Sequence, residues 1–123
     1  MDTIKTLVIE PLRRPELRDI DPSITAIGKT IGGYAEPLPL DRRTTLWCDE
    51  EGAIKNLKPN RTIRLSQDSR LADAGKPIII RGTFVITGPH PQDGPLGLDD
   101  EQIGRYAAMF ADPEAPCRLP DGK

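Results

Sequence analysis

The stretch IIIRGTFVIT, residues 78–87, is the most hydrophobic run in the chain. A short apolar run that is rich in β-branched residues and bounded by turn residues is typical of a buried strand, so this stretch predicts the central strand of a sheet. Because side chains alternate along a strand, one face would carry four apolar side chains, those of Ile78, Ile80, Phe84 and Ile86. Gly82 interrupts the run and would mark a bulge that shifts the alternation locally.

Other strand-like segments surround this one in the sequence. Residues 3–10 and 44–48 combine β-branched and apolar side chains, and residues 16–20 alternate apolar with charged ones. Pro11 ends the first segment, so residues 16–20 are expected to return as the second strand of a hairpin. A further hairpin is expected to join residues 44–48 to AIKNL, residues 53–57, across the turn DEEG.

Residues 21–33 have the signals of a helix. Asp21 followed by Pro22 is a helix-start signal, because aspartate can cap free amides and proline at the first helical position loses no needed donor. The helical spacing places three side chains on one face, those of Ile24, Ile27 and Ile31. The pair Gly32 and Gly33 supplies the left-handed residue that commonly ends a helix.

A second helix is expected to begin after Asp99. That residue can cap the helix, and Gln102 completes the spacing of a capping box. The buried stripe would consist of Ile103, Tyr106, Ala107 and Phe110. Pro113 and Pro116 end the element.

These elements predict an α+β fold, with a mainly antiparallel sheet of hairpins and two amphipathic helices on one face. A chain of 123 residues fits one domain, expected over residues 1–112 and followed by a flexible C-terminal tail over residues 113–123. Residues 58–77 form the longest stretch without sustained periodicity, and such loops are often functional or mobile.

Composition and charge exclude several classes of function. The 19 acidic and 17 basic side chains give a formal charge of −2, which argues against dedicated nucleic-acid binding and against DNA mimicry. The two cysteines form neither a disulfide framework nor a metal-binding spacing, which is typical of a reducing cytosol. No signal peptide or membrane span is visible in the sequence. We therefore expect a soluble protein of the host-cell cytoplasm.

The sequence contains few candidate catalytic groups. His90 lies between prolines with no metal ligand at a suitable spacing, and Cys48 has no histidine base near it in the sequence. The three consecutive acids 49–51 fit a solvated turn better than a magnesium site, because successive turn residues diverge. We expect no enzyme activity, no metal and no cofactor.

Two groups of basic residues could bind an anion. Arg81 lies in the most apolar strand, where its guanidinium must either form an internal salt bridge, to Glu36 or Glu10, or face a ligand. The second group clusters in sequence and comprises Arg42, Arg43, Lys55, Lys58, Arg61 and Arg64. This cluster is either a phosphate site or a solvated basic face.

The stretch KTIGGYAEPLPL, residues 29–40, has two readings that are compatible. Its glycines can end a helix, and they can also let a ligand or partner approach the backbone closely. The two prolines of this stretch are tolerated only at a sheet edge or in a loop.

The segments VIEP, IGGYAEPL, CDEEGAIKNLKPNR, RGTFVITG and LDDEQIGRYAAMF, taken in order, resemble an uncharacterised domain family that is common in bacteriophages, plasmids and other mobile elements. The resemblance covers residues 3 to 112 and implies a small accessory protein, with no catalytic residues to transfer. The positions that match the motifs are Gly32, Gly33, Tyr34, Glu36, Glu51, Gly52, Asn60, Arg61 and Gly82. At position 49 this chain has aspartate, whereas asparagine is more common there in the family that it resembles.

The first hypothesis for function is a non-catalytic phage or mobile-element protein that counters a host process, as an anti-defence protein sequestering an anionic nucleotide signal would. The expected ligand-binding residues are Tyr34, Glu36, Asn60, Arg61 and Arg81. Tyr34 would stack or hydrogen-bond and the arginines would hold phosphate. The alternative is a protein-interaction inhibitor of a host enzyme, acting through an exposed sheet edge or the YAEPLPL strip. The oligomeric state is left open, with room for a homo-oligomer.

Overall fold

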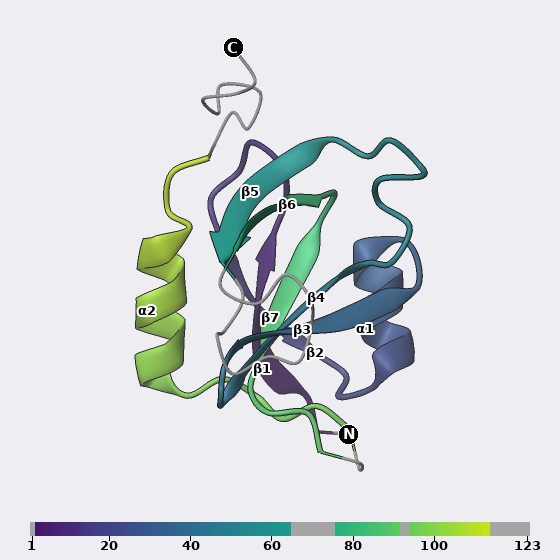
Figure 1. Ribbon diagram of the computed structural model, residues 1–123. Helices are drawn as coiled ribbons and strands as arrows, with labels where there is room; N and C mark the ends of the chain where they lie inside the picture. Colours follow the sequence, from purple (N-terminus) through teal and green to yellow (C-terminus); the bar gives the residue numbers. More distant parts are fainter. Residues whose placement is uncertain (1, 65–75, 92–93, 114–123) are drawn as a thin grey trace.

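The computed structural model describes residues 2–64, 76–91 and 94–113, and in these ranges it has an α+β fold built on antiparallel sheets (Figure 1). The elements are β1 (Ile4–Ile9), β2 (Glu16–Ile20), α1 (Ile24–Ile31), β3 (Ala35–Asp41), β4 (Thr44–Asp49), β5 (Pro59–Arg64), β6 (Pro77–Arg81), β7 (Phe84–Thr87) and α2 (Asp100–Met109). The expected tail beyond residue 113 lies outside the described residues. Neither α1 nor α2 has the length and apolar character needed to cross a bilayer.

The main sheet has five strands in the order β2-β1-β7-β4-β3, and every neighbouring pair is antiparallel. The run that predicted the central strand supplies two strands. Its second half is β7, at the centre of the sheet, and its first half is β6, which pairs with β5 in a separate two-stranded sheet. Gly82 separates them with a positive φ of 79°, a conformation that glycine adopts without steric cost.

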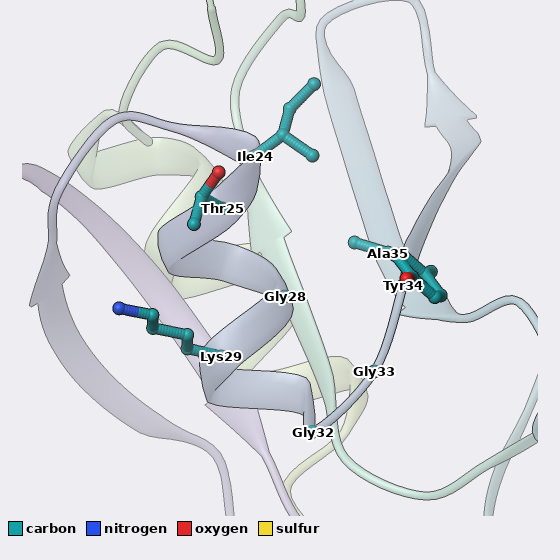
Figure 2. A pocket seen from close by; sticks show the side chains of 8 residues that line it. All are labelled: Ile24, Thr25, Gly28, Lys29, Gly32, Gly33, Tyr34 and Ala35. Atoms are coloured by element: carbon teal, nitrogen blue, oxygen red, sulfur yellow. The ribbon is translucent and has the colours of Figure 1, made fainter.

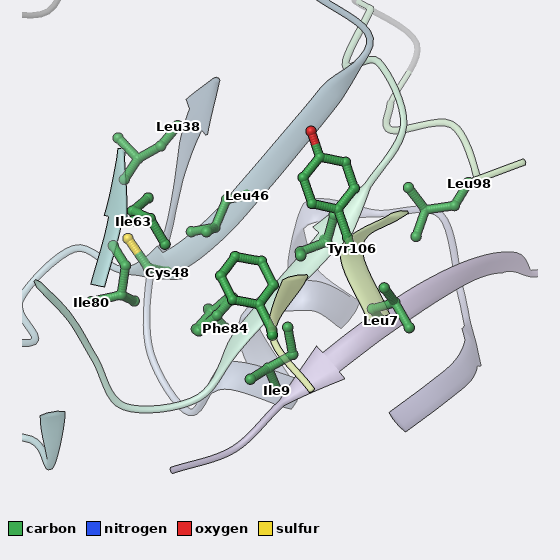
Figure 3. Close-up of a cluster of buried hydrophobic side chains, with 12 residues drawn as sticks. Leu7, Ile9, Leu38, Leu46, Cys48, Ile63, Ile80, Phe84, Leu98 and Tyr106 are labelled. Carbon is green, nitrogen blue, oxygen red and sulfur yellow. The ribbon is translucent and has the colours of Figure 1, made fainter. Parts of the chain in front are cut away.

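Both faces of the central strands are buried. The first core lies on one face and is formed by Leu7, Ile9, Leu38, Leu46, Cys48, Ile63, Ile80, Phe84, Ile86, Leu98, Tyr106 and Phe110 (Figure 3). The second core lies on the other face and is formed by Val8, Ile20, Ile27, Ile31, Trp47 and Val85. Neighbouring residues of β1 alternate between the two, since Leu7 and Ile9 belong to the first core and Val8 to the second.

The two helices cover opposite faces of the sheet, which corrects the expectation that they share one face. α1 contributes Ile27 and Ile31 to the second core, and α2 contributes Tyr106 to the first core. Figure 1 shows α1 and α2 on either side of the strands. The reason lies in the central strands, where consecutive residues such as Phe84 and Val85 are all apolar, so both faces need a cover.

The ends of α1 are set by local side chains and by glycine. Ser23, not Asp21, is the N-cap, and its hydroxyl accepts a hydrogen bond from Ala26 N at 3.1 Å. Gly32 ends the helix with a φ of 93°, and its N–H donates to Gly28 O at 2.7 Å. The glycine C-cap predicted from the sequence is therefore confirmed.

α2 is joined to the β3–β4 hairpin by polar contacts. Its predicted capping box is present, with Gln102 N donating to Asp99 Oδ1 at 2.8 Å and Asp99 N donating to Gln102 Oε1 at 2.9 Å. The Gln102 amide also donates to Arg43 O at 2.8 Å and to Thr44 Oγ1 at 3.0 Å. The Tyr106 hydroxyl donates to the Asp41 carboxylate. These bonds fix the helix over the first core.

The segment expected to return as a strand after DEEG forms turns instead. Residues 50–56 are a series of turns, and Leu57 N, just after them, donates to Gly52 O at 2.9 Å. Ile54 is 84% exposed, so the segment AIKNL has no apolar face to bury against the sheet. The true partner of β4 on that side is β3, whose residues 35–41 contain two prolines.

The stretch 58–77, expected to be irregular, contains a strand at each end. β5 occupies Pro59–Arg64 and β6 begins at Pro77, and the two pair in antiparallel register. Residues 65–75 lie outside the described residues. The strand was missed because Asn60, Arg61 and Arg64 break the expected alternation, and two of these polar side chains point inward.

Candidate functional site

Asn60 and Arg61, two residues expected to bind a ligand, lie inside the fold. Each side chain is 0% exposed. Asn60 Nδ2 donates to Ile9 O and to Gly82 O, both at 2.9 Å, and thereby joins the end of β1 to the break between β6 and β7. Buried amides are normally satisfied in this way, so Asn60 stabilises the junction of the two sheets.

Arg61 connects three segments that are distant in the sequence. Its Nη1 donates to Asn60 Oδ1 at 2.7 Å, and its Nη2 donates to Arg13 O at 2.7 Å and to Phe110 O at 2.9 Å. The guanidinium thus joins β5, the turn between β1 and β2, and the end of α2. Backbone carbonyls, which carry partial negative charge, solvate this buried cation. No phosphate can reach it without opening the core.

Arg81 is half-buried and reaches a backbone carbonyl. Its Nη1 donates to Leu57 O at 3.2 Å, which holds the turns of residues 50–56 against β6. Within the part of the chain that the structure describes, it forms no ion pair with Glu36 or with Glu10. The internal salt bridge considered from the sequence is therefore not formed among these residues.

Tyr34 and Glu36 lie at the start of β3, an edge strand of the main sheet. Tyr34 is 78% exposed and Glu36 is also exposed. Glu36 pairs with Cys48 in the register of β3 and β4. The structure therefore leaves both side chains at the surface, whereas the side chains of Asn60 and Arg61 are enclosed, and the five expected site residues do not form one site.

Tyr34 lines a surface groove of about 460 Å³ beside α1 (Figure 2). The groove is lined by Ile24, Thr25, Gly28, Lys29, Gly32, Gly33, Tyr34 and Ala35. Thr25 and Lys29 stand on one side of the glycines, and Tyr34 stands on the other. Sequence reasoning selected Tyr34 and the two adjacent glycines, but it missed Thr25 and Lys29, which follow the helical spacing of the solvent-facing side of α1.

The floor of the groove is made of glycine backbone in close contact. A Cβ on Gly28 would lie 2.9 Å from Gly33 O, so only glycine lets the chain after α1 fold back onto the helix. A Cβ on Gly33 would collide with the Asp49 carboxylate and would lie 2.8 Å from Lys55 Nζ. The glycines therefore have both a packing role and a surface that a ligand can approach.

An ion pair between the buried Asp49 and the exposed Lys55 lies directly behind this floor. The Asp49 side chain is 1% exposed, and its Oδ2 lies 2.6 Å from Lys55 Nζ. Its Oδ1 accepts the N–H of Glu51 at 2.8 Å. Burial acts to raise the pKa of Asp49, but the hydrogen bonds from Lys55 and Glu51 and the charge of Lys55 outweigh it and hold the pKa below its usual value. The expectation of a fully solvated acidic turn is therefore wrong for Asp49, although Glu50 and Glu51 are exposed.

A family model described as a domain of unknown function, DUF3846, matches residues 4–111. The chain belongs to the DUF3846 family. The matched range contains all the described strands and both helices. Comparison with curated proteins and with solved structures gives no match to the chain.

The surroundings of Cys48 and His90 in this DUF3846 domain are those of structural residues. Burial raises the pKa of the Cys48 thiol to about 12, and the charges of Glu36 and Asp49 add to this effect. A thiol in that state is a poor nucleophile at neutral pH. The exposed His90 ring packs its edge against Trp47, with ring centroids 4.7 Å apart. Neither residue lines the groove.

A second groove of the DUF3846 domain, about 400 Å³, lies between the β3–β4 turn and α2. It carries Arg42, Arg43 and Arg105 together with Asp41 and Glu101. Arg43 Nη2 lies 2.6 Å from Asp99 Oδ2, and Arg105 lies within 4 Å of both acids of the groove. The carboxylates offset the arginine charge, so this groove is a weaker candidate for an anion. Among the described residues, no group of three or more His, Cys, Asp or Glu side chains is placed to hold a metal ion.

Proposed function

We propose that this protein is a non-catalytic binding protein that holds an anionic, nucleotide-like ligand in the groove beside Tyr34. The observation that carries the proposal is the 78% exposed ring of Tyr34, which stands next to a floor of three glycines. A groove of about 460 Å³ falls within the range of roughly 300–1,000 Å³ that ligand pockets occupy. A planar group could stack on this ring while the glycine backbone admits it closely.

The anionic part of the ligand is assigned to the other side of the groove. Lys29 is exposed there and has no ion-pair partner among the described residues, so its ammonium is available for phosphate. Thr25 adds a hydroxyl one helical turn away. Gly28 O, at the C-terminal end of α1, already accepts the N–H groups of Gly32 and Gly33, which reduces the repulsion that free helix carbonyls would exert on an anion.

The lining of the groove supports binding without chemistry. Its eight residues include no carboxylate, histidine or cysteine, the usual groups for proton transfer or nucleophilic attack. Asn60 and Arg61 are left out of the proposed site because they are enclosed, and Glu36 and Arg81 do not line the groove. A binding protein that only sequesters its ligand needs none of these groups.

The biological setting of the proposal is that of a phage or mobile-element accessory protein that counters a host process in the cytoplasm. It rests on the resemblance of the IGGYAEPL and CDEEGAIKNLKPNR segments to a domain family that is common in phages and mobile elements. Removal of a nucleotide signal would fit a protein with a binding groove and no catalytic lining.

Thermal unfolding with a panel of mononucleotides, dinucleotides and cyclic nucleotides tests the proposal. A ligand that binds the native state raises Tm, and about 1 kcal/mol of stabilisation corresponds to roughly 4 °C for a domain of this size. We expect Tyr34→Ala and Lys29→Ala to abolish the shift, whereas Tyr34→Phe should keep most of it, because stacking needs the ring and not the hydroxyl. Ile54→Ala is the matched control, since Ile54 is exposed and lies outside the groove. No shift with any member of the panel would reject the proposal.

The alternative of a host-enzyme inhibitor acting through β3 is not favoured by the edge of that strand. Tyr34 O accepts the N–H of Glu50 at 2.9 Å, so the backbone N–H and C=O groups of Tyr34 face β4. Because these groups alternate along an antiparallel strand, those of Ala35 and of every second residue after it face away from the sheet. The outward-facing positions include Pro37 and Pro39, which have no N–H. A strand added to this edge would receive no backbone N–H hydrogen bond from Pro37 or from Pro39.

A further inference from the structure

The opposite edge of the main sheet, strand β2, keeps its backbone donors. Arg18 O accepts a hydrogen bond from Thr6 Oγ1 at 2.8 Å, so the Arg18 carbonyl points toward β1. Because backbone groups alternate along an antiparallel strand, the N–H and C=O groups of Leu17 and Asp19 point away from the sheet. Natural sheets usually block such an edge, and β3 is blocked by its prolines, whereas no strand of the described part of the chain pairs with the outer side of β2.

The Leu17 side chain adds an apolar contact at this open edge. It is 52% exposed and is the second residue of a five-residue strand, between Glu16 and Arg18. Arg18 Nη2 and Glu16 Oε1 form an ion pair of 2.6 Å within the strand, and both side chains remain partly exposed. The edge therefore combines backbone groups that bond to no other described residue, an exposed leucine and one charge of each sign.

We propose that β2 is the site at which two copies of this chain pair, as antiparallel strands related by a twofold axis through Leu17. In this register Leu17 lies opposite the partner subunit's Leu17, so the outward N–H and C=O groups of the two residues bond to each other. Glu16 lies opposite the partner subunit's Arg18, and the reverse pair completes the symmetry. Opposite charges directly across two strands stabilise the pairing.

The alternative twofold register is disfavoured by charge. An axis through Arg18 would place two guanidinium groups directly opposite each other, and like charges across a strand pair are destabilising. In the Leu17 register the Asp19 N–H meets the partner subunit's Pro15 at its carbonyl, whereas the Asp19 carbonyl meets a proline nitrogen that has no hydrogen. Charge complementarity therefore selects the Leu17 register.

Pairing through β2 leaves the Tyr34 groove open. The sheet order β2-β1-β7-β4-β3 places β2 and the strand that follows Tyr34 at opposite edges, so pairing through β2 leaves Tyr34 accessible. The argument for pairing uses no residue of the groove, and a dimer would carry two grooves.

Sedimentation velocity of the full chain over a range of concentrations tests the pairing, with charge reversal as the specific probe. We expect a dimer for the native sequence. Glu16→Arg alone and Arg18→Glu alone should each weaken dimerisation at least about tenfold, because every cross-strand charge pair becomes repulsive. An equimolar mixture of the two single variants should form a heterodimer, and the double variant E16R/R18E should dimerise like the native chain.

Circular dichroism and thermal unfolding of each variant establish that its monomer is folded, which the exposure of both side chains leads us to expect. A native chain that stays monomeric up to about 1 mM, the effective upper limit of weak association, would overturn the proposal. A dimer that is indifferent to both single reversals would overturn it as well. Capture of a host protein by β2 in a chain that does not self-associate would assign the edge to that partner and would equally reject the second copy.

Discussion

Lys55 Nζ lies 2.6 Å from Asp49 Oδ2, and the carboxylate that it contacts is 1% exposed. This pair connects the turns of residues 50–56 to the floor of the Tyr34 groove, because Gly33 lies against both of its charged groups. The site proposed for ligand binding is therefore supported from behind by a buried charge and its partner.

Removal of Lys55 should destabilise the fold by leaving the Asp49 carboxylate buried without its cation. We expect Lys55→Met to lower the free energy of unfolding, because the Asp49 carboxylate keeps the hydrogen bond from Glu51 N but loses its cation. Lys58→Met is the matched control, because Lys58 is exposed and forms no ion pair among the described residues. Urea unfolding of both variants measures the difference. An equal effect of the two substitutions would show that the ion pair contributes nothing specific.

At acidic pH, the free energy of unfolding should depend on the protonation of Asp49 in the same ion pair. The pKa of Asp49 is held below its ordinary value of 3.8, so the folded state favours the ionised carboxylate. Its contribution is then fully present above the pKa of the unfolded chain and is lost as the pH falls through the lower pKa of the folded protein. The difference in unfolding free energy between the native chain and Asp49→Asn should shrink below about pH 4. A difference that stays constant down to pH 2 would contradict this assignment.

The local part of the fold could be predicted from the sequence, whereas the long-range part could not. The glycine end of α1 and the capping box of α2 depend on residues within four positions of one another, so their signals are visible in the chain. Which face each helix covers depends on the packing of strands that are far apart in sequence. The strand β7 is buried on both faces, yet the sequence led us to expect both helices on one face, because its apolar run does not indicate how the sheet is covered.

In the candidate site, too, local features could be predicted from the sequence and long-range contacts could not. Arg61 and Tyr34 were selected by residue type and by motif, and residue type alone does not separate a cation that binds phosphate from one that binds carbonyls. Arg61 finds its partners 48 and 49 positions away, at Arg13 and Phe110, and such distances carry no periodic signal. Tyr34 stayed at the surface because the adjacent glycines turn the chain out of α1.

Substitution of Arg61 should therefore affect stability and not ligand affinity. We expect Arg61→Met to lower the free energy of unfolding by about 1–3 kcal/mol for each buried acceptor left unsatisfied, because the carbonyls of Arg13 and Phe110 lose their donor. Arg14→Met is the control, since Arg14 is exposed in the same β1–β2 connection. Chemical denaturation measures both changes. A folded Arg61→Met protein of native stability would show that the network is dispensable.

Cys48 should be inert in the native protein. Its side chain lies in the first core, and its pKa of about 12 leaves almost no thiolate at pH 8. In a chain carrying Cys117→Ser, we expect a disulfide reagent to modify no thiol within minutes at pH 8, and to modify one after addition of denaturant. Rapid labelling of the native chain would show that β4 opens more readily than its burial implies.

Two glycine substitutions should change stability in opposite directions. Gly33→Ala places a methyl group against the Asp49 carboxylate and Lys55 Nζ, which are held by their ion pair and cannot move without breaking it. We expect a loss of about 1–3 kcal/mol, the usual cost of overpacking, together with a weaker nucleotide-induced shift in Tm.

Gly104 lies on the exposed side of α2, and a Cβ there would meet no atom within 4 Å. Gly104→Ala should therefore stabilise the protein by about 0.5–1 kcal/mol, because alanine has the higher helix propensity. Thermal unfolding distinguishes the two, and a Gly33→Ala protein as stable as Gly104→Ala would show that the ion pair does not constrain the floor of the groove.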